Sequence, residues 1–477
     1  MPTLPVKQKI VSLGQKLKKT PFDVAALVLL CAVLFVVMLL LSGYYLNLRV
    51  NGTSSTLPEI PAKDRWIMTG SAYAEKTGTK SLLSPYFMGI KFADGSQCAA
   101  TFDTSARQSL SAMLDASLES LLTGELKHIS LPTQADRRAY AAELCAAERY
   151  TFYALFGELP AAALLPALHN GDATGPVENF FVKYIFLLPD EQNFVYAVML
   201  DAALNAVCLY PREDLPYNAD SLYSIRETKG YAGFSFTDGL PHSVVFTESF
   251  DVASVVIMPS SAFYSYQMGE DKTDKLLKTL GFNTGVTKCV RTGDGSAINF
   301  VDEKRELYVD LDNASMTFSA GGDGLHLSDF LGYYPDNDSS YSFADRILGV
   351  KYLLGSMDRL LVGGDATPAF VGTLGKENGV TVFYLKYFYN GVMLTDKSYD
   401  IAVEMKADAV MSFTATTLFC DSGYMTKPVL PQTLTLPLFS TEASEMTTYY
   451  AMFENDASTN QVKLVWVAAR EGEGKSE

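Results

Sequence analysis

The sequence is poor in the residue patterns that build catalytic and metal sites. Its 477 residues include four histidines, none of them at i, i+4 spacing or in an HExxH pattern. The nucleophile-elbow pattern GxSxG does not occur. The Gly-x-Gly pairs at 293–295 and 322–324 lack the third glycine of a dinucleotide loop and fall between predicted strands. We therefore predict no catalytic residue, no metal ligand and no cofactor, although carboxylates distant in sequence can still meet in a fold.

Cysteine is also scarce, and its spacing does not indicate disulfide pairs. The six cysteines show no CxxC spacing, and one of them, Cys31, lies in a long apolar run, which leaves an odd five elsewhere. A disulfide-stapled secreted fold has dense, paired cysteines. We therefore expect small buried thiols, as in a bacterial extracellular protein with a large core.

Two acidic patterns and the aromatic residues have ordinary interpretations. Asp310-x-Asp312 and Asp336-x-Asp338 begin like calcium loops but lack the residues that complete them, so we expect turns. The 28 phenylalanines and 27 tyrosines suit sheet faces and cores. The alternative is that some tyrosines form an exposed binding surface; the candidates are Tyr333-Tyr334, Tyr384–Tyr389 and Tyr449-Tyr450.

One stretch is apolar enough to cross a membrane. Residues Val24 to Leu41 contain no charge, proline or glycine, and the run continues in weaker form to residue 46. At ~1.5 Å per residue, 23 residues give ~34 Å, enough to span a ~30 Å hydrocarbon core with some tilt. We predict a transmembrane helix over residues 24–46.

The charges around this run predict its orientation. Residues 1–23 carry five lysines, among them Lys16, Lys18 and Lys19, and one aspartate. A lysine excess marks the cytoplasmic flank, so the large C-terminal part is expected outside the membrane. A cleaved signal peptide is the alternative, but its apolar region is usually shorter and is followed by a small-residue site that this sequence lacks.

The remainder of the chain is acidic. Net charge is −16, and because residues 1–23 carry +4 the rest carries −20. Such a balance argues against nucleic acid or anionic lipid as a simple electrostatic partner. A solubility role explains most of the acidity.

The order of predicted elements indicates an α+β fold, with antiparallel sheets packed with helices in a multi-domain ectodomain. Residues 47–64 are polar and proline-containing, typical of a linker. We predict an N-terminal and middle α+β region over 65–280 and a C-terminal α+β region over 281–477, whose two strand sets resemble each other in outline. The first predicted helix has Asp103 or Thr104 as its N-cap, a stripe of leucines from Leu110 to Leu122 and Gly124 at its end. The other predicted helices are 134–149, 271–280 and 341–363, and residues 211–242 are expected to form a long connection with a short helix. The predicted strands are 86–92, 98–102, 150–156, 180–188, 193–200, 204–210, 243–246, 253–258, 289–291, 297–301, 306–311, 315–318, 381–389, 392–394, 399–405, 409–416 and 462–468. We expect a hairpin turn at Asp94-Gly95 between the first two strands, and an antiparallel meander of 180–188, 193–200 and 204–210.

Three stretches resemble those of a known family. They are Phe156-Gly157-Glu158-Leu159-Pro160; Leu280-Gly281-Phe282-Asn283 with the later Asp294-Gly295 and Asn299–Val301; and Tyr389-Asn390-Gly391-Val392 with Tyr399–Met405. Together with the layout, they are similar to the YycH and YycI accessory proteins of the WalK sensor kinase in low-GC Gram-positive bacteria. The chain length is nearer to that of YycH.

The resemblance implies a regulator that acts by contact and not by catalysis. The implied partner is a sensor histidine kinase of a two-component system in cell-wall homeostasis, with a second YycH- or YycI-like protein as a further partner. The implied contact element is the span, where Val24 and Leu41 bound the apolar run and Ala25, Ala26 and Ala32 are its small residues. Because no GxxxG pattern marks a packing face, a plain lipid-facing anchor is the alternative.

Three functions are consistent with these sequence features. The first is a membrane-anchored, extracytoplasmic regulator of a sensor kinase. The second is a cell-envelope ligand-binding module or surface enzyme that uses an acidic or tyrosine-lined cleft. The third is a structural protein of the envelope.

Overall fold

The computed structural model describes residues 85–102, 104–122, 124–164, 180–211, 213–227, 230–259, 271–331, 341–364, 367–389, 391–395, 397–429, 447–456 and 461–470. The described residues all fall within one compact unit. The predicted cytoplasmic segment, span and linker lie outside the described residues and stay predictions. Within the part that is described, no helix is both long and apolar enough to cross a membrane.

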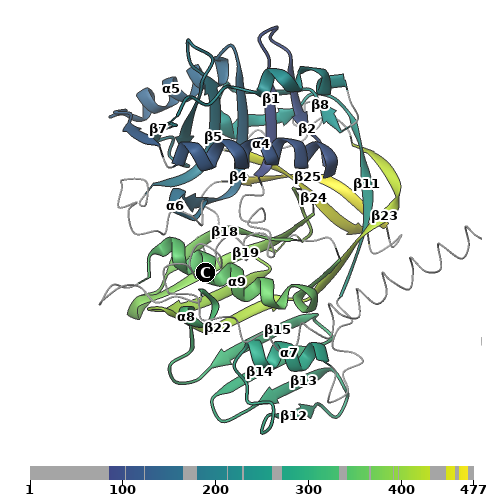
Figure 1. Ribbon diagram of the computed structural model, residues 1–477. Helices are drawn as coiled ribbons and strands as arrows, with labels where there is room; N and C mark the ends of the chain where they lie inside the picture. The colour runs from purple at the N-terminus through teal and green to yellow at the C-terminus, as the bar shows by residue number, and fades with distance from the viewer. Residues whose placement is uncertain are drawn as a thin grey trace, which may run out of the picture. The chain divides into compact units, whose positions relative to one another are not determined.

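An eight-stranded antiparallel sheet forms the N-terminal part of the described chain (Figure 1). Its strand order is β3-β7-β6-β5-β4-β1-β2-β8. The strands are β1 Pro85–Lys91, β2 Gln97–Ala100, β3 Glu125–His128, β4 Tyr150–Pro160, β5 Phe181–Pro189, β6 Val195–Leu200, β7 Ala206–Tyr210 and β8 Tyr231–Ala232. The pairing of β5 with β6 and of β6 with β7 confirms the predicted meander, and β1 pairs with β2 across the predicted Asp94-Gly95 turn.

Both faces of this sheet are covered at its centre. Every side chain from Tyr150 to Phe156 is buried, as is every one from Val182 to Leu188. On one face, the Tyr153 hydroxyl donates to the Leu110 carbonyl of helix α4 at 3.1 Å. On the other face, the Phe152 ring meets the Phe236 ring edge to face, with 5.2 Å between centroids. Continuous apolar runs are what a doubly covered sheet requires.

The covering elements are helices, 3₁₀ turns and a small sheet. The helices are α4 Thr104–Leu122, α5 Gln134–Ala146, α6 Ala161–Leu164 and the 3₁₀ turns η4 Ala219–Glu227 and η5 Pro241–Ser243. The leucine stripe predicted for α4 is buried, with Leu110, Leu114 and Leu121 fully inaccessible. The small sheet pairs β9 Phe234–Phe236 with β10 Val244–Phe246. Strands β8 and β9 fall where the sequence predicts only a connection with a short helix.

A long ribbon joins strands that lie far apart in the sequence. Strand β11 (Phe250–Pro259) pairs antiparallel with β23 (Leu418–Val429), and β17 (Val362–Gly364) pairs parallel with β23. The parallel pair departs from the purely antiparallel prediction. Because β11 precedes the predicted boundary at residue 280 and β23 follows it, strand pairing links the two predicted regions, whose division stays a prediction.

The C-terminal part is built on a twelve-stranded sheet. Its main order is β12-β13-β14-β15-β22-β21-β19-β20-β24-β25, with β16 paired to β22 and β18 paired to β19. Strands β20 and β24 run parallel; the other pairs are antiparallel. The strands are β12 Lys288–Arg291, β13 Ala297–Val301, β14 Arg305–Asp310, β15 Ser315–Ala320, β16 Leu325–His326, β18 Thr367–Gly375, β19 Val380–Tyr389, β20 Val392–Met393, β21 Ile401–Lys406, β22 Ala409–Thr416, β24 Thr447–Asp456 and β25 Gln461–Arg470.

One face of this sheet packs on helices. Strand register places a single row of apolar side chains across it, and these residues are Phe300, Leu307, Phe318, Phe413, Val403 and Phe383. The Phe383 ring lies 5.6 Å from the ring of Phe343 in helix α9. The helices of this part are α7 Asp271–Thr279, α8 Leu327–Leu331 and α9 Phe343–Leu361, with the 3₁₀ turn η6 Glu377–Gly379. Helices α7 and α9 match the predicted segments.

A seam joins the eight-stranded and twelve-stranded sheets. The Phe156 ring of β4 stacks on the Phe388 ring of β19, with 3.5 Å between centroids. A Cβ atom added to Gly157 would come within 2.7–2.8 Å of the Val371 backbone in β18. At Gly391 (φ +89°) an added Cβ would lie 2.6 Å from the guanidinium carbon of Arg107. Phe156 and Gly157 of one stretch that resembles the YycH and YycI family, and Gly391 of another, therefore lie at this seam.

Candidate functional site

The second face of the C-terminal sheet is open to solvent along several strands. Strands β14 and β15 alternate buried and exposed side chains, in contrast to the continuous burial of β4 and β5. The register row on this open face consists of Asn299, Tyr308, Thr317, Thr414, Ala402 and Tyr384. Tyr308 is 40% exposed. We call this surface the open face.

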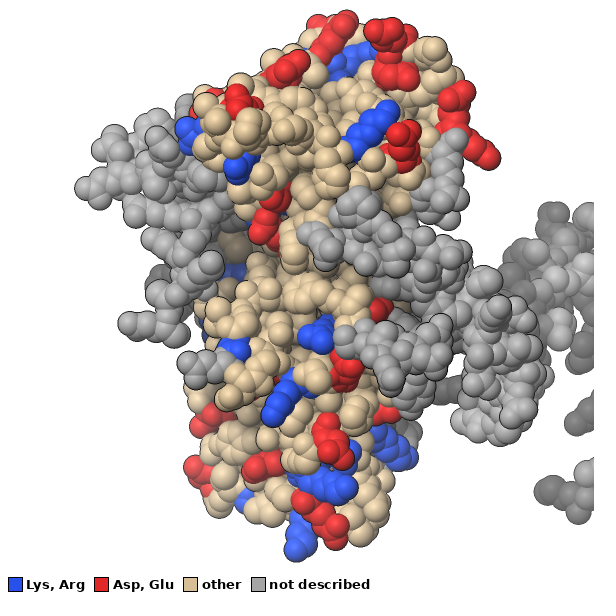
Figure 2. Space-filling view, turned by 90° about the vertical axis from the view of Figure 1, so that its left-hand side faces the viewer, with Lys and Arg blue, Asp and Glu red and all other residues tan. Residues whose placement is uncertain are grey.

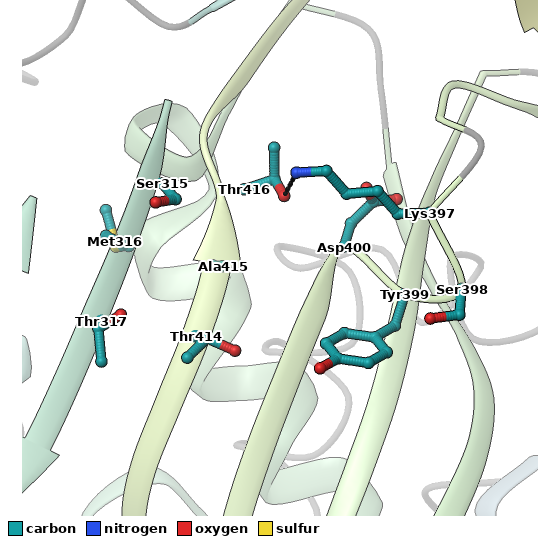
Figure 3. Close-up of a pocket in the computed structure, with 10 residues that line it drawn as sticks. All are labelled: Ser315, Met316, Thr317, Lys397, Ser398, Tyr399, Asp400, Thr414, Ala415 and Thr416. Carbon is teal, nitrogen blue, oxygen red and sulfur yellow. Dashed lines mark hydrogen bonds between the residues drawn. The ribbon is translucent and has the colours of Figure 1, made fainter. Parts of the chain in front are cut away.

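A hollow of about 490 Å³ lies on the open face. Figure 3 shows its lining, which comes from β15, from β22 and from the loop that precedes β21. The lining residues are Ser315, Met316, Thr317, Lys397, Ser398, Tyr399, Asp400, Thr414, Ala415 and Thr416. Five of them carry a hydroxyl group on a serine or threonine side chain: Ser315 and Thr317 on β15, Thr414 and Thr416 on β22, and Ser398 in the loop.

Asp400 fixes the loop at the edge of the hollow. Its side chain is 3% exposed, and its two oxygens accept from the Tyr387 backbone N–H at 2.8 Å and from the Thr395 hydroxyl at 2.6 Å. Burial raises the pKa of this carboxyl, while its hydrogen bonds and the nearby Lys386 and Lys397 act in the opposite direction. Both oxygens are thus engaged in holding the loop.

The exposed part of the loop presents a cation and an aromatic ring. The Lys397 ammonium donates to the Thr416 hydroxyl at 3.1 Å, the bond drawn in Figure 3. Among the described residues it forms no ion pair. The Tyr399 ring packs on the Tyr384 ring, with 4.7 Å between centroids and 40° between planes, and 40% of Tyr399 remains exposed. The packing of one ring on the other limits the positions that Tyr399 can take.

The arrangement provides binding groups more than reacting groups. The hollow offers hydroxyl groups, one ammonium and one aromatic ring, and its one carboxylate is bonded to the protein on both oxygens. Nowhere among the described residues do three or more His, Cys, Asp or Glu side chains come together in a group that could hold a metal ion. On the face drawn in Figure 2, acidic and basic side chains are interspersed over the described residues.

The residues predicted as contact sites all belong to the N-terminal 46 residues. Val24, Ala25, Ala26, Ala32 and Leu41 lie outside the described residues. So do the flanking lysines, Lys16, Lys18 and Lys19. Their roles stay predictions.

The tyrosine-containing segments have different outcomes. In the segment 384–389, Tyr387 and Tyr389 are buried, so the idea of an exposed surface is wrong for them, whereas Tyr384 is half-buried under Tyr399. Tyr333-Tyr334 lie outside the described residues, and the side chains of Tyr449-Tyr450 are not described.

Other sequence interpretations can be checked directly. Asp310 accepts from the Asn313 backbone and side chain at 2.9 and 2.8 Å, which confirms its turn role. Cys98, Cys145 and Cys208 are buried free thiols, and burial raises their pKa values; Cys289 is half-buried. Asp336 and Asp338 lie outside the described residues.

Comparison with known proteins gives a likeness in fold alone. No protein-family model matches the sequence, and no curated protein matches it. The crystal structure of YycH from Bacillus subtilis is similar to this structure, with a TM-score of 0.50 and 11% sequence identity, over 83% of this chain and 95% of that one. An uncharacterized protein from Eubacterium rectale matches at a TM-score of 0.27 and 14% identity, over 46% of this chain and 77% of that one. The YycH-like fold agrees with the family resemblance noted in the sequence.

Proposed function

We propose that this chain is a membrane-anchored, extracytoplasmic protein that regulates a two-component sensor histidine kinase by direct contact. The observation that carries the proposal is the YycH-like fold, which extends over most of both chains. The apolar run 24–46 with its lysine-rich N-terminal flank supports the anchor. The absence of local catalytic motifs from the sequence agrees with a protein that works by contact.

Regulation by contact requires a difference in affinity. The protein must bind one signalling state of the kinase more tightly than the other, because equal binding to both states shifts no population. A coupling of about 1–3 kcal/mol changes the balance about 5- to 150-fold. The span is proposed to contribute contacts within the membrane, and the described part of the chain to contribute contacts outside. A second YycH- or YycI-like protein would complete the complex.

Co-purification tests this function. Full-length protein, solubilised with the membrane, is expected to retain a sensor histidine kinase. Replacement of Val24–Leu41 by an unrelated apolar span, with Lys16, Lys18 and Lys19 kept as the matched flank, should weaken the association. Deletion of the protein should alter the kinase's signalling, and unaltered signalling would show the proposal to be wrong.

A ligand-binding module of the cell envelope is the second candidate. The hollow on the open face favours it, since this is a concave site with polar groups from three segments. A surface enzyme would need reacting groups in addition, which a test for substrate turnover would reveal.

A further inference from the structure

We propose that the hollow on the open face binds a sugar that carries a carboxylate group. The inference rests on three features that coincide there: an exposed aromatic ring, several hydroxyl side chains and one exposed ammonium. It is independent of the kinase proposal, because it concerns a ligand of the described part of the chain alone.

The aromatic ring supplies a stacking surface. Tyr399 is 40% exposed at the edge of the hollow, and its contact with Tyr384 holds it in place. An aromatic ring fixed in this way presents a large apolar area at a small cost in conformational entropy. The apolar face of a sugar ring can stack on the Tyr399 ring. The hydroxyl groups at the edge of the sugar then remain free to form hydrogen bonds.

The hydroxyl side chains match the edges of a sugar. Thr317 and Thr414 lie side by side on neighbouring strands, with Ser315 and Thr416 as the next pair along the same face. Each hydroxyl both donates and accepts, as the hydroxyl groups of a sugar do. In the described structure, the side chains of Ser315, Thr317 and Thr414 have no hydrogen-bond partner in the protein, so they remain available to a ligand.

The single ammonium specifies the charge of the ligand. Lys397 is exposed, donates to the Thr416 hydroxyl at 3.1 Å and, among the described residues, forms no ion pair. Its remaining N–H groups can bind a carboxylate, a strong charge-assisted contact. A nucleic-acid strand would require several cations along its phosphates, and the lining holds one. A monosaccharide or disaccharide with one acidic group therefore fits the site best.

The two probes are methyl β-D-glucuronide and methyl β-D-glucoside. They differ only at C6, which is a carboxylate in the glucuronide and a hydroxymethyl group in the glucoside. Their binding to the full-length protein in detergent is measured by ligand-observed saturation-transfer NMR and by calorimetry. The open site predicts weak binding of the glucuronide, with Kd on the order of 1 mM. The glucoside is expected to bind at least about 5-fold more weakly, because it cannot use Lys397.

Surface variants locate the site and leave the core intact. Lys397→Met should reduce glucuronide affinity to that of the glucoside, while the matched control Lys406→Met, an exposed lysine at the far end of β21, should change neither. Tyr399→Ala should weaken both sugars about 5-fold or more, and Tyr399→Phe, which keeps the ring, should stay within about twofold.

Several results would overturn the proposal. Equal affinity for the two sugars would remove the role of the carboxylate. Binding that survives both Lys397→Met and Tyr399→Ala would place the sugar elsewhere, and no detectable binding of either sugar at about 20 mM would exclude the site. None of these results bears on kinase association.

Discussion

The two large sheets of this protein differ in how their faces are used. The N-terminal sheet is covered on both faces at its centre, so consecutive residues such as Phe152 and Tyr153 are both fully buried. In the C-terminal sheet the row that includes Phe413 packs on helices, and the adjacent Thr414 is exposed. The first sheet is therefore enclosed by other elements at its centre, and the second leaves part of one face exposed to solvent.

The two sheets should tolerate substitutions differently. On a doubly covered sheet almost every substitution creates a cavity or a clash. On a sheet with one open face, alternate positions can change with little loss of stability, and binding groups can be placed there. The hollow lies on such positions.

The largest expected effect comes from neighbouring residues in the two sheets. Phe152→Ala, Tyr153→Ala and Phe413→Ala are each expected to lower the free energy of unfolding by about 3–5 kcal/mol. Thr414→Ala should change it by less than about 0.5 kcal/mol. Urea unfolding of the four variants measures the contrast. A small loss of unfolding free energy for Tyr153→Ala, or a large loss for Thr414→Ala, would contradict the difference between the two sheets.

Two buried lysines provide the next test. Lys351 on α9 is 6% exposed, its ammonium has no hydrogen-bond partner in the described structure, and burial lowers its pKa to about 7. Lys183 on β5 is 5% exposed and donates to the Phe156 carbonyl at 2.6 Å. Replacing Lys351 should remove the free-energy cost of burying an ammonium that has no hydrogen-bond partner among the described residues. Replacing Lys183 should remove its hydrogen bond to the Phe156 carbonyl.

The sign of the Lys351 effect depends on pH. Below pH 7 the Lys351 ammonium is charged in both the folded and the unfolded protein, and the folded protein must bury that charge. Between pH 7 and about 10.5 only the unfolded chain still binds the proton. The free energy of unfolding therefore rises with pH between these two values. Lys351→Met should stabilise the protein at pH 6 by about 4–5 kcal/mol, with a gain that shrinks towards pH 10. Lys183→Met should destabilise it by about 1–3 kcal/mol. A gain for Lys351→Met that is the same at every pH would contradict the assignment.

The seam between the sheets gives a smaller effect. Gly157→Ala should cost roughly 1–3 kcal/mol, because the added carbon meets backbone atoms of Val371 that cannot rotate away. Gly372→Ala is the matched control, since nothing lies within 4 Å of the added carbon. Thermal unfolding compares the two. Equal effects would mean that the sheets do not pack closely at Gly157.

Helix capping gives the smallest effect and should be the same in both parts. Thr133 caps α5 and Ser342 caps α9, each through a reciprocal capping box with an aspartate three residues later, Asp136 and Asp345. Replacement of either cap residue by alanine should cost about 1 kcal/mol. A much larger loss at one end, measured by urea unfolding, would show that this helix depends on its cap more than on packing.

Sequence patterns predict much of the local structure. The leucine stripe of α4 and the Asp94-Gly95 turn carry their signals within a few residues, so both were predictable. The strands Thr367–Gly375 (β18) and Leu418–Val429 (β23) were not predicted. Strand β18 contains proline and glycine, which weaken the strand signal even though its partner β19 follows it directly in the chain. Strand β23 depends on β11, a partner distant in sequence. Local propensity carries little information about such pairing.

The candidate site could not be predicted for a related reason. Its lining comes from residues 315–317, 397–400 and 414–416, which meet only because β15 and β21 both pair with β22. The alternation of small polar residues in β15 and β22 did carry a signal for an open face. It did not indicate that Tyr399, and not the neighbouring Tyr387 or Tyr389, would be the exposed ring.

The central claim is that this protein changes the state of a kinase by touching it. The most direct measurement is the autophosphorylation rate of the co-purifying sensor histidine kinase in one membrane preparation, with and without the full-length protein. The account predicts a rate that changes about 5-fold or more with the intact chain and reverts when the span is exchanged. An unchanged rate under conditions where the two proteins are shown to be bound would contradict it.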